Sequence, residues 1–169
     1  MRNDWHGLIK ILEIQHIRNN EVIWENKNLY NTVHLLADEY MLKCLFVNDG
    51  TLLPTSYYLG MDNRTTVATT DTITDLVDEP SSNGYQRQSL GIEDGWTVQY
   101  ASGAYRAIGD IITFNATGGG YGPLRQLFLT NKIDNSGVLL ATVPLTGVLN
   151  MSSGDSINLR MSLSLKDYS

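Results

Sequence analysis

Alternation of hydrophobic and polar residues predicts β-strands along most of the chain. The pattern is clearest near the C-terminus, where polar residues separate five apolar ones: Ile157, Leu159, Met161, Leu163 and Leu165. A period of two places the apolar set on a core and the polar set in solvent or at an interface. Near the N-terminus, apolar segments at 8–17 and 21–24 flank Asn19 and Asn20. These residues predict a hairpin, because asparagine tolerates the left-handed conformation of a tight turn.

Further short strands are expected between turn-forming residues. They cover the segments 56–61, 84–90, 96–100, 105–115, 124–130 and 138–143. About eight to ten short strands at regular spacing, with turn residues between them, are typical of all-β folds and indicate a sandwich or barrel. We therefore expect a mainly β fold, namely an antiparallel, jelly-roll-like β-sandwich that forms a single domain over residues 1–169.

One segment, 33–46, has helical spacing instead. Its apolar residues lie three and four positions apart and form one helical face: Val33, Leu36, Ala37, Tyr40, Met41 and Cys44. Asn31 or Thr32 can cap the start of this helix. We predict an α-helix packed across the sandwich with Leu36, Tyr40 and Met41 buried. A short helical turn over 71–78 is also expected, with Asp71 as its cap and Pro80 after its end.

Composition and charge narrow the classes of partner. Charged residues make up 18% of the chain, below the usual quarter. This fits either a subunit with much contact surface or an all-β domain rich in Thr, Ser and Asn. The net charge is −6 and the 12 basic residues are scattered, which argues against nucleic acid as a partner. No apolar run suits a membrane span or a signal peptide, so we expect neither membrane contact nor secretion by that route.

A glycine-rich motif is the most conspicuous candidate site: Gly118, Gly119, Gly120, Tyr121 and Gly122, followed by Pro123. A phosphate-binding loop would need a Lys and a Ser or Thr that open a helix, and a dinucleotide site would need a βαβ unit. We interpret the motif as a tight strand connection and predict that it lies at a contact between subunits, with Tyr121 as the anchor. The alternative is a solvent-exposed connection with Tyr121 folded back on its own core.

The remaining reactive residues favour structural roles. Neither His6, His16 nor His34 has a metal-ligand partner at suitable spacing, and the single cysteine, Cys44, falls on the apolar helix face, where we expect it to be buried. One cysteine allows no intrachain disulfide and fits a reducing cytoplasm. Four acidic residues lie close in sequence: Asp71, Asp75, Asp78 and Glu79, with Asp62 nearby. Calcium prefers clustered carboxylates, but this spacing matches no calcium loop that we recognise.

Catalytic patterns are also missing from the sequence. Neither a Ser-His-Asp order nor a Gly-x-Ser-x-Gly elbow occurs. We therefore expect no enzymatic activity, no metal and no cofactor. A glycosidase needs only two carboxylates at a suitable distance, so a small hydrolase on a sandwich scaffold stays open as a further hypothesis.

The order of several motifs resembles a group of small tailed-bacteriophage structural proteins. In that group a YLGL strand precedes an EP-x-x-x-GYxRQ segment, a Gly-rich loop and a closing GD strand. The matching segments here are 57–62, 78–88, 112–123, 127–130 and 153–159, which include Glu79-Pro80, Gly84-Tyr85 and Gly154-Asp155. Each of these three pairs suits a turn or an extended entry into a strand.

The resemblance implies a non-enzymatic virion subunit, either a capsid-decorating (cement) protein or a neck or tail accessory protein. Such a subunit would assemble in the host cytoplasm as a homo-oligomer and bind other virion proteins. The alternative is a carbohydrate- or receptor-binding module of a tail fibre or baseplate. A sugar-binding module should expose several aromatic residues in a groove, whereas a structural subunit should have large flat contacts and little concavity.

Overall fold

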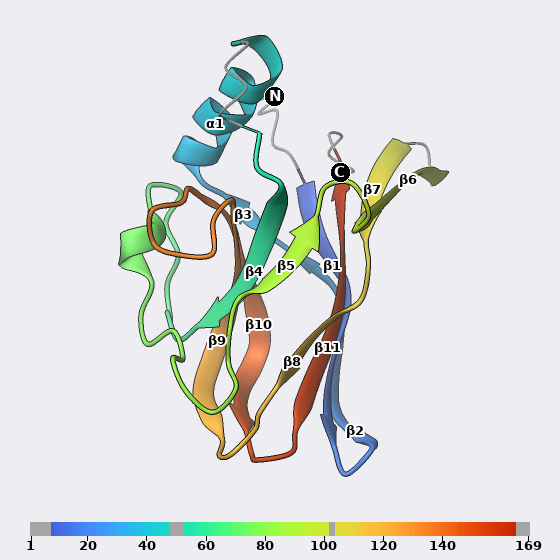
Figure 1. Cartoon of the computed structure of the whole chain (residues 1–169), viewed down its shortest axis with the longest axis vertical. Coiled ribbons are helices and arrows are strands. Elements are labelled where there is room, and N and C mark those ends of the chain that lie inside the picture. The colour runs from blue at the N-terminus through green and yellow to red at the C-terminus, as the bar shows by residue number, and fades with distance from the viewer. Residues whose placement is uncertain (1–7, 48–52, 102–103, 165–169) are drawn as a thin grey trace.

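The computed structural model describes residues 8–47, 53–101 and 104–164, which form two packed antiparallel sheets and one short α-helix (Figure 1). The six-stranded sheet has the order β2-β1-β11-β7-β6, with β8 also paired to β11. Its strands are β1 (Leu8–Arg18), β2 (Glu21–Tyr30), β6 (Trp96–Ala101), β7 (Ala104–Gly109), β8 (Ile112–Asn115) and β11 (Ser156–Ser164). The expected β-sandwich with one helix is confirmed.

The second sheet has five strands in the order β3-β10-β9-β4-β5. Its strands are β3 (Thr32–Val33), β4 (Ser56–Asp62), β5 (Gln88–Gly91), β9 (Tyr121–Thr130) and β10 (Leu139–Met151). The core lies between the two sheets. Ile157, Leu159 and Met161 of β11 are buried there, as their alternation predicts, while Leu163 is half-buried and Leu165 lies outside the described residues. Each fully buried side chain of this size stabilises the fold by about 1.5–3 kcal/mol.

The N-terminal hairpin is confirmed. β1 and β2 pair in antiparallel register, and Asn19 and Asn20 between them have φ angles of 50° and 64°. Two consecutive residues with positive φ form the turn that matches the twist of paired strands. The strands beside this turn end at the opposite end of the sandwich from the helix (Figure 1).

Several of the expected strands have different limits: the segment 21–24 continues as β2 to Tyr30, and the segment 124–130 begins as β9 at Tyr121. The segment 84–90 is a strand only from Gln88 onward. The segment 105–115 is interrupted at Asp110 and Ile111, because β7 and β8 pair with successive parts of β11. The segment 138–143 continues as β10 through Pro144 to Met151, with a shift in register against β9.

Helix α1 (Leu35–Phe46) stands at one end of the sandwich and does not pack across it, as Figure 1 shows. The predicted cap at Asn31 or Thr32 is wrong, because Thr32 and Val33 form β3 and pair with β10. His34 occupies the N-cap position without a side-chain capping bond, and the Leu35 amide donates to the Thr69 carbonyl oxygen at 2.9 Å. Among the described helices, none is long and apolar enough to cross a bilayer.

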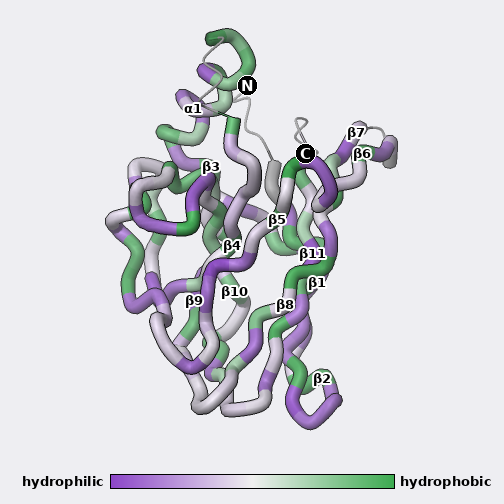
Figure 2. The backbone as a smooth tube through the Cα atoms, viewed as in Figure 1, coloured by the Kyte–Doolittle hydropathy of each residue, from purple (hydrophilic) through white to green (hydrophobic). Residues whose placement is uncertain are grey.

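The buried face of α1 consists of Ala37 and Tyr40, with Met41 and Cys44 half-buried beside them. Leu36 is 43% exposed, so the prediction that it is buried is wrong. The helix touches the sandwich along a narrow strip, since it stands at the end of the sheets and only residues spaced like 37, 40, 41 and 44 reach them. Figure 2 colours much of α1 as hydrophobic, and Leu35, Leu42, Leu45 and Phe46 are exposed.

Candidate protein interface and apolar cavity

Polar residues of the recognised motifs form ion pairs inside the fold. Asp155, at the turn before β11, is buried and accepts hydrogen bonds from Arg18 Nη2 at 2.7 Å and from the Ser152 amide at 2.7 Å. His16 Nε2 lies 2.8 Å from its Oδ2. The bonds from Arg18, together with those from Ser152 and His16, lower the pKa of Asp155 although burial opposes them. This carboxylate therefore ties the end of β1 to the closing turn.

Glu79 and Arg87 form the second pair. Arg87 donates to both carboxylate oxygens of Glu79, at 2.6 and 2.8 Å, and its guanidinium carbon lies 5.0 Å from the centre of the Phe128 ring. The Tyr85 hydroxyl donates to the same carboxylate at 3.1 Å. Such a bidentate arginine–carboxylate pair is geometrically specific. It holds the segment before β5 against Phe128 of β9.

Arg64 connects the acidic residues near β4. It is buried, pairs with Asp62 and donates to Asp71 Oδ2 at 3.2 Å and to Thr142 Oγ1 at 3.2 Å. His34 Nε2 lies 2.8 Å from the same threonine oxygen. Burial raises the pKa of Asp62 against the opposing effect of Arg64, and burial also lowers the pKa of His34. The network fixes the long connection after β4 to β10.

The acidic cluster thus divides among separate structural roles. The expected helical turn is a 3₁₀ turn, η1 (Ile73–Asp75), and its cap is Thr72, with Asp75 completing the capping box. The prediction of Asp71 as cap is therefore wrong, and Asp78 lies 3.4 Å from the Asn63 side-chain amide. No group of three or more His, Cys, Asp and Glu residues suited to a metal ion occurs in 8–47, 53–101 and 104–164. His6 lies outside the described residues.

The glycine motif is held by its own chain. Gly118, Gly119 and Gly120 connect β8 to β9, whereas Tyr121, Gly122 and Pro123 already belong to β9. A Cβ at Gly120 would collide with the Met151 carbonyl oxygen, and the Asn83 side chain donates to the Gly120 carbonyl. Close contacts within the chain therefore account for Gly119, Gly120 and Gly122, and the positive φ of 76° accounts for Gly118.

Tyr121 is not an exposed anchor. It is only 8% exposed, and its ring centre lies 5.5 Å from that of Tyr85 in an edge-to-face contact. The structure corrects this part of the prediction and matches the alternative in which the ring folds back on the core. A contact between subunits at Gly118, Gly119, Gly120 and Gly122 stays a prediction.

A different region exposes apolar side chains. They lie on and after α1 and on the β6–β7 hairpin, which Figure 1 places at the same end of the molecule. Phe46, Leu45 and Tyr105 are the most exposed, at 78%, 69% and 71%. We call this set the helix-end surface; each of its nine members is more than half exposed: Leu35, Leu42, Leu45, Phe46, Val47, Leu53, Val98, Tyr100 and Tyr105.

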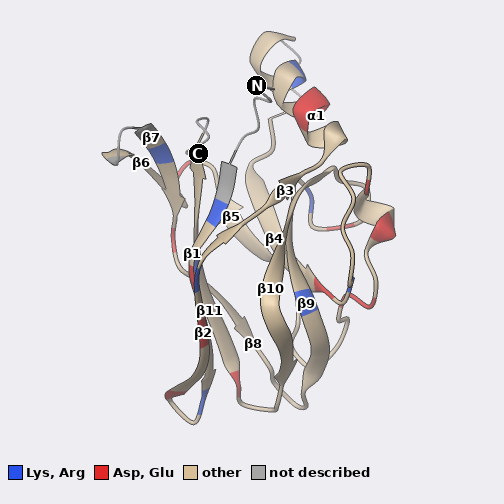
Figure 3. Cartoon of the chain, turned by 180° about the vertical axis from the view of Figure 1, so that it is seen from behind, with Lys and Arg blue, Asp and Glu red and all other residues tan. Residues whose placement is uncertain are grey.

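Few charges interrupt the helix-end surface. β6 has no charged residue and β7 has one, Arg106; on α1, Glu39 and Lys43 pair with each other at 2.6 Å, and Asp38 is the third charged residue (Figure 3). The sequence offered a signal for this surface, because α1 carries apolar residues almost all round. An all-round apolar helix is normally buried.

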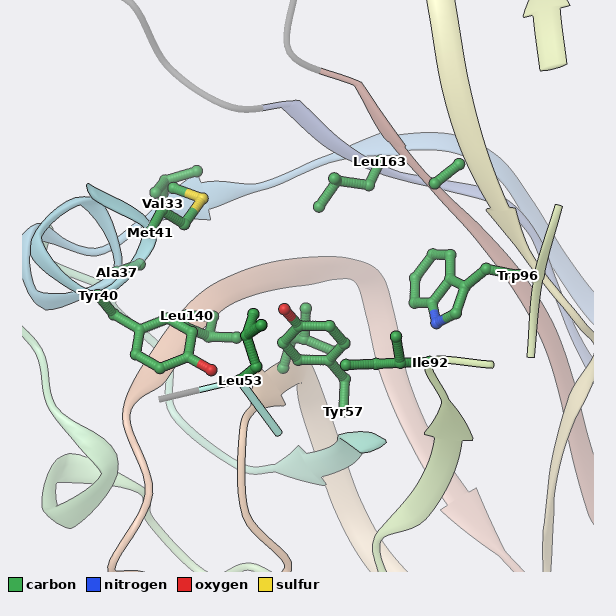
Figure 4. Close-up of a pocket in the computed structure, with 12 residues that line it drawn as sticks. Val33, Ala37, Tyr40, Met41, Leu53, Tyr57, Ile92, Trp96, Leu140 and Leu163 are labelled. Carbon is green, nitrogen blue, oxygen red and sulfur yellow. The ribbon is translucent and has the colours of Figure 1, made fainter. Parts of the chain in front are cut away.

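An apolar cavity of about 340 Å³ lies between the sheets beside α1. Figure 4 shows Tyr40 at one side of it, Trp96 at the other and Tyr57 between them. The twelve described residues that line it include no charged residue. Such concavity departs from the expectation of little concavity for a structural subunit.

No protein-family model matches the chain, and no curated protein matches it at a significant level.

Proposed function

We propose that this chain is a non-enzymatic structural subunit of a tailed-bacteriophage particle, of the capsid-decorating or neck and tail accessory type. It binds copies of itself, and other virion proteins, through the helix-end surface. The observation that carries the proposal is the exposure of nine large apolar side chains at one end of the fold. Grouped exposed apolar residues mark protein interaction sites, and here they gather on and after α1 and on the β6–β7 hairpin.

The buried ion pairs support a non-enzymatic role. Asp155, Glu79 and Asp62 each pair with an arginine that is wholly or partly buried in the fold. A catalytic carboxylate pair would instead face a cleft that a substrate can enter. The order of the sequence motifs supports the assignment to a phage particle, and particle assembly places the chain in the host cytoplasm before it enters the virion.

The double variant Leu45→Glu and Phe46→Ser tests the surface. Both side chains are mostly exposed, so the variant should keep the melting temperature of the parent but lose self-association and incorporation into particles. The matched control is Val22→Ser with Ile23→Ser, two exposed apolar residues in β2 beside the turn at the opposite end. Light scattering after size exclusion and immunoblots of purified particles measure the effects. Normal incorporation of the helix variant contradicts the proposal.

One observation favours the second candidate, a carbohydrate-binding module of a tail fibre or baseplate. Tyr100 and Tyr105 are both exposed on the β6–β7 hairpin, with ring centres 5.3 Å apart. Exposed aromatic rings stack on apolar faces of sugars as well as on proteins. A glycan array decides the matter: binding that disappears in Tyr100→Ala with Tyr105→Ala supports the carbohydrate role over assembly.

A further inference from the structure

We propose that the cavity beside α1 binds a neutral aliphatic molecule of medium chain length with a single hydrogen-bond acceptor, such as a fatty alcohol. Its lining shares one residue, Leu53, with the helix-end surface, and the site does not depend on the proposed virion role. The cavity of about 340 Å³ lies between the two sheets, with Leu163 and Ala107 from one sheet and Leu129 and Leu140 from the other.

The volume sets the size of the ligand. A buried apolar cavity of about 150 Å³ holds one benzene molecule. The cavity here is roughly twice as large, so it has room for about ten carbon atoms. This falls within the range of about 300–1,000 Å³ that small-molecule sites occupy.

The apolar residues that line the cavity disfavour both bound water and a charged ligand. A buried water molecule needs two to four polar partners, and cavities with apolar walls stay dry. None of the described lining residues is charged, so a carboxylate or an amine in the cavity would lack an ionic partner. Burying an unpaired charge is costly, which favours a neutral ligand. An aliphatic chain fits because it restores dispersion contacts that an empty cavity lacks.

Trp96 supplies the polar contact. Its Nε1 is buried and has no hydrogen-bond partner among the described residues. A buried indole N–H normally finds an acceptor, so the unsatisfied donor calls for one. In Figure 4 the indole stands at one side of the cavity with its nitrogen toward Tyr57 and Ile92. A ligand oxygen at this side would accept the N–H bond, and the aliphatic chain would extend toward Tyr40 and Met41.

Calorimetric titration of the whole chain with 1-decanol, and with sodium decanoate at pH 7, tests ligand class. We expect a dissociation constant on the order of 10–100 μM for the alcohol, set by apolar burial minus the cost of immobilisation. The charged decanoate should bind at least about tenfold more weakly, because its carboxylate would lie unpaired in the cavity. Absence of 1-decanol binding up to its solubility limit overturns the proposal.

Three variants locate the bound alcohol. Ala107→Phe fills the cavity and should abolish binding while the protein still melts cooperatively; Ala107→Leu serves where the larger ring prevents folding. Trp96→Phe keeps the apolar volume but removes the donor, so the affinity should fall by about three- to tenfold. Trp24→Phe, a half-buried tryptophan of β2 outside the cavity lining, is the control and should bind like the parent.

Two results would contradict the proposed location of the alcohol site or the proposed occupant of the cavity. Binding that persists unchanged in Ala107→Phe or Ala107→Leu places the alcohol elsewhere. Binding that occurs only as oligomers dissociate, followed by light scattering in the same samples, shows that side chains of a second copy fill the cavity. That result would reject the small-molecule site yet leave the proposed assembly role intact, so the two proposals fail separately.

Discussion

Single polar residues determine where the loops of this sandwich lie. Asp155, Arg87 and Arg64 are each buried and each meets several partners that are distant in the sequence. Removing one partner of a buried ion pair costs about 3–5 kcal/mol, because the other charge is left unpaired. The motifs that contain these residues therefore specify contacts within the fold.

The pH dependence of stability tests the role of Asp155. Its folded pKa is lowered from the ordinary 3.8, so the stability that it contributes is fully present above that value and is lost as the pH falls below it. Asp155→Asn should reduce the free energy of unfolding at pH 7 by about 2–4 kcal/mol. The variant should also lose less further stability than the parent between about pH 5 and pH 2. Guanidinium denaturation at several pH values measures both, and equal acid sensitivity contradicts this role.

A double-mutant cycle tests the pair of Glu79 and Arg87. Arg87→Met alone should cost about 3 kcal/mol, since it leaves a partly buried carboxylate without its guanidinium partner. Adding Glu79→Gln should recover part of that loss, with a coupling energy of about 1–3 kcal/mol. Urea denaturation of the parent, the two single variants and the double variant gives the coupling. Additive losses would show that the pair contributes little.

Among the elements, α1 has a narrow buried strip and a wide exposed face. Tyr40→Ala should destabilise the protein by about 3 kcal/mol, because it empties a buried aromatic position against the sandwich. Leu36→Ser changes a side chain of the same helix that is 43% exposed, and it should cost less than about 1 kcal/mol. Thermal melting followed by circular dichroism compares them. Similar losses in both variants would place Leu36 in a buried contact.

The periodic elements were predictable, and their limits were less so. Period-two alternation and the Asn19-Asn20 turn identify β11 and the first hairpin from local sequence alone. The helix was also expected, but the face that it buries was not. That face depends on how β3, which pairs with β10, leads into α1 at the end of the sheets. Pro144 and Gly147 suggest an end to β10, yet the strand continues with a shifted register.

The candidate sites were less predictable than the strands. His16 and Asp155 lie 139 positions apart, so no local pattern connects them. Residues from both sheets and α1 meet at the cavity, and only the tertiary fold brings them together. The glycine motif attracted attention as a possible contact, but its close approaches are to Asn83 and Met151 of the same chain. The apolar residues around α1 were visible in the sequence, although their exposure was not.

For the whole molecule, the distribution of apolar residues predicts how association responds to salt. The helix-end surface is apolar and nearly free of unpaired charge, so the dissociation constant of the oligomer should change less than about threefold between 0.1 and 1 M NaCl. Association should also show a negative heat-capacity change, the mark of apolar burial. Sedimentation velocity and calorimetric dilution measure these. Strong weakening by salt would indicate an ionic interface elsewhere.

The most direct test of the proposed virion role is electron cryo-microscopy of intact phage particles whose genome encodes this chain. We expect density for the sandwich at a repeated position in the capsid, neck or tail. In that density, α1 and the β6–β7 hairpin should contact neighbouring protein, whereas the β1–β2 turn need not. Particles that lack the chain, or that contain it with the helix-end surface facing solvent, would contradict the account.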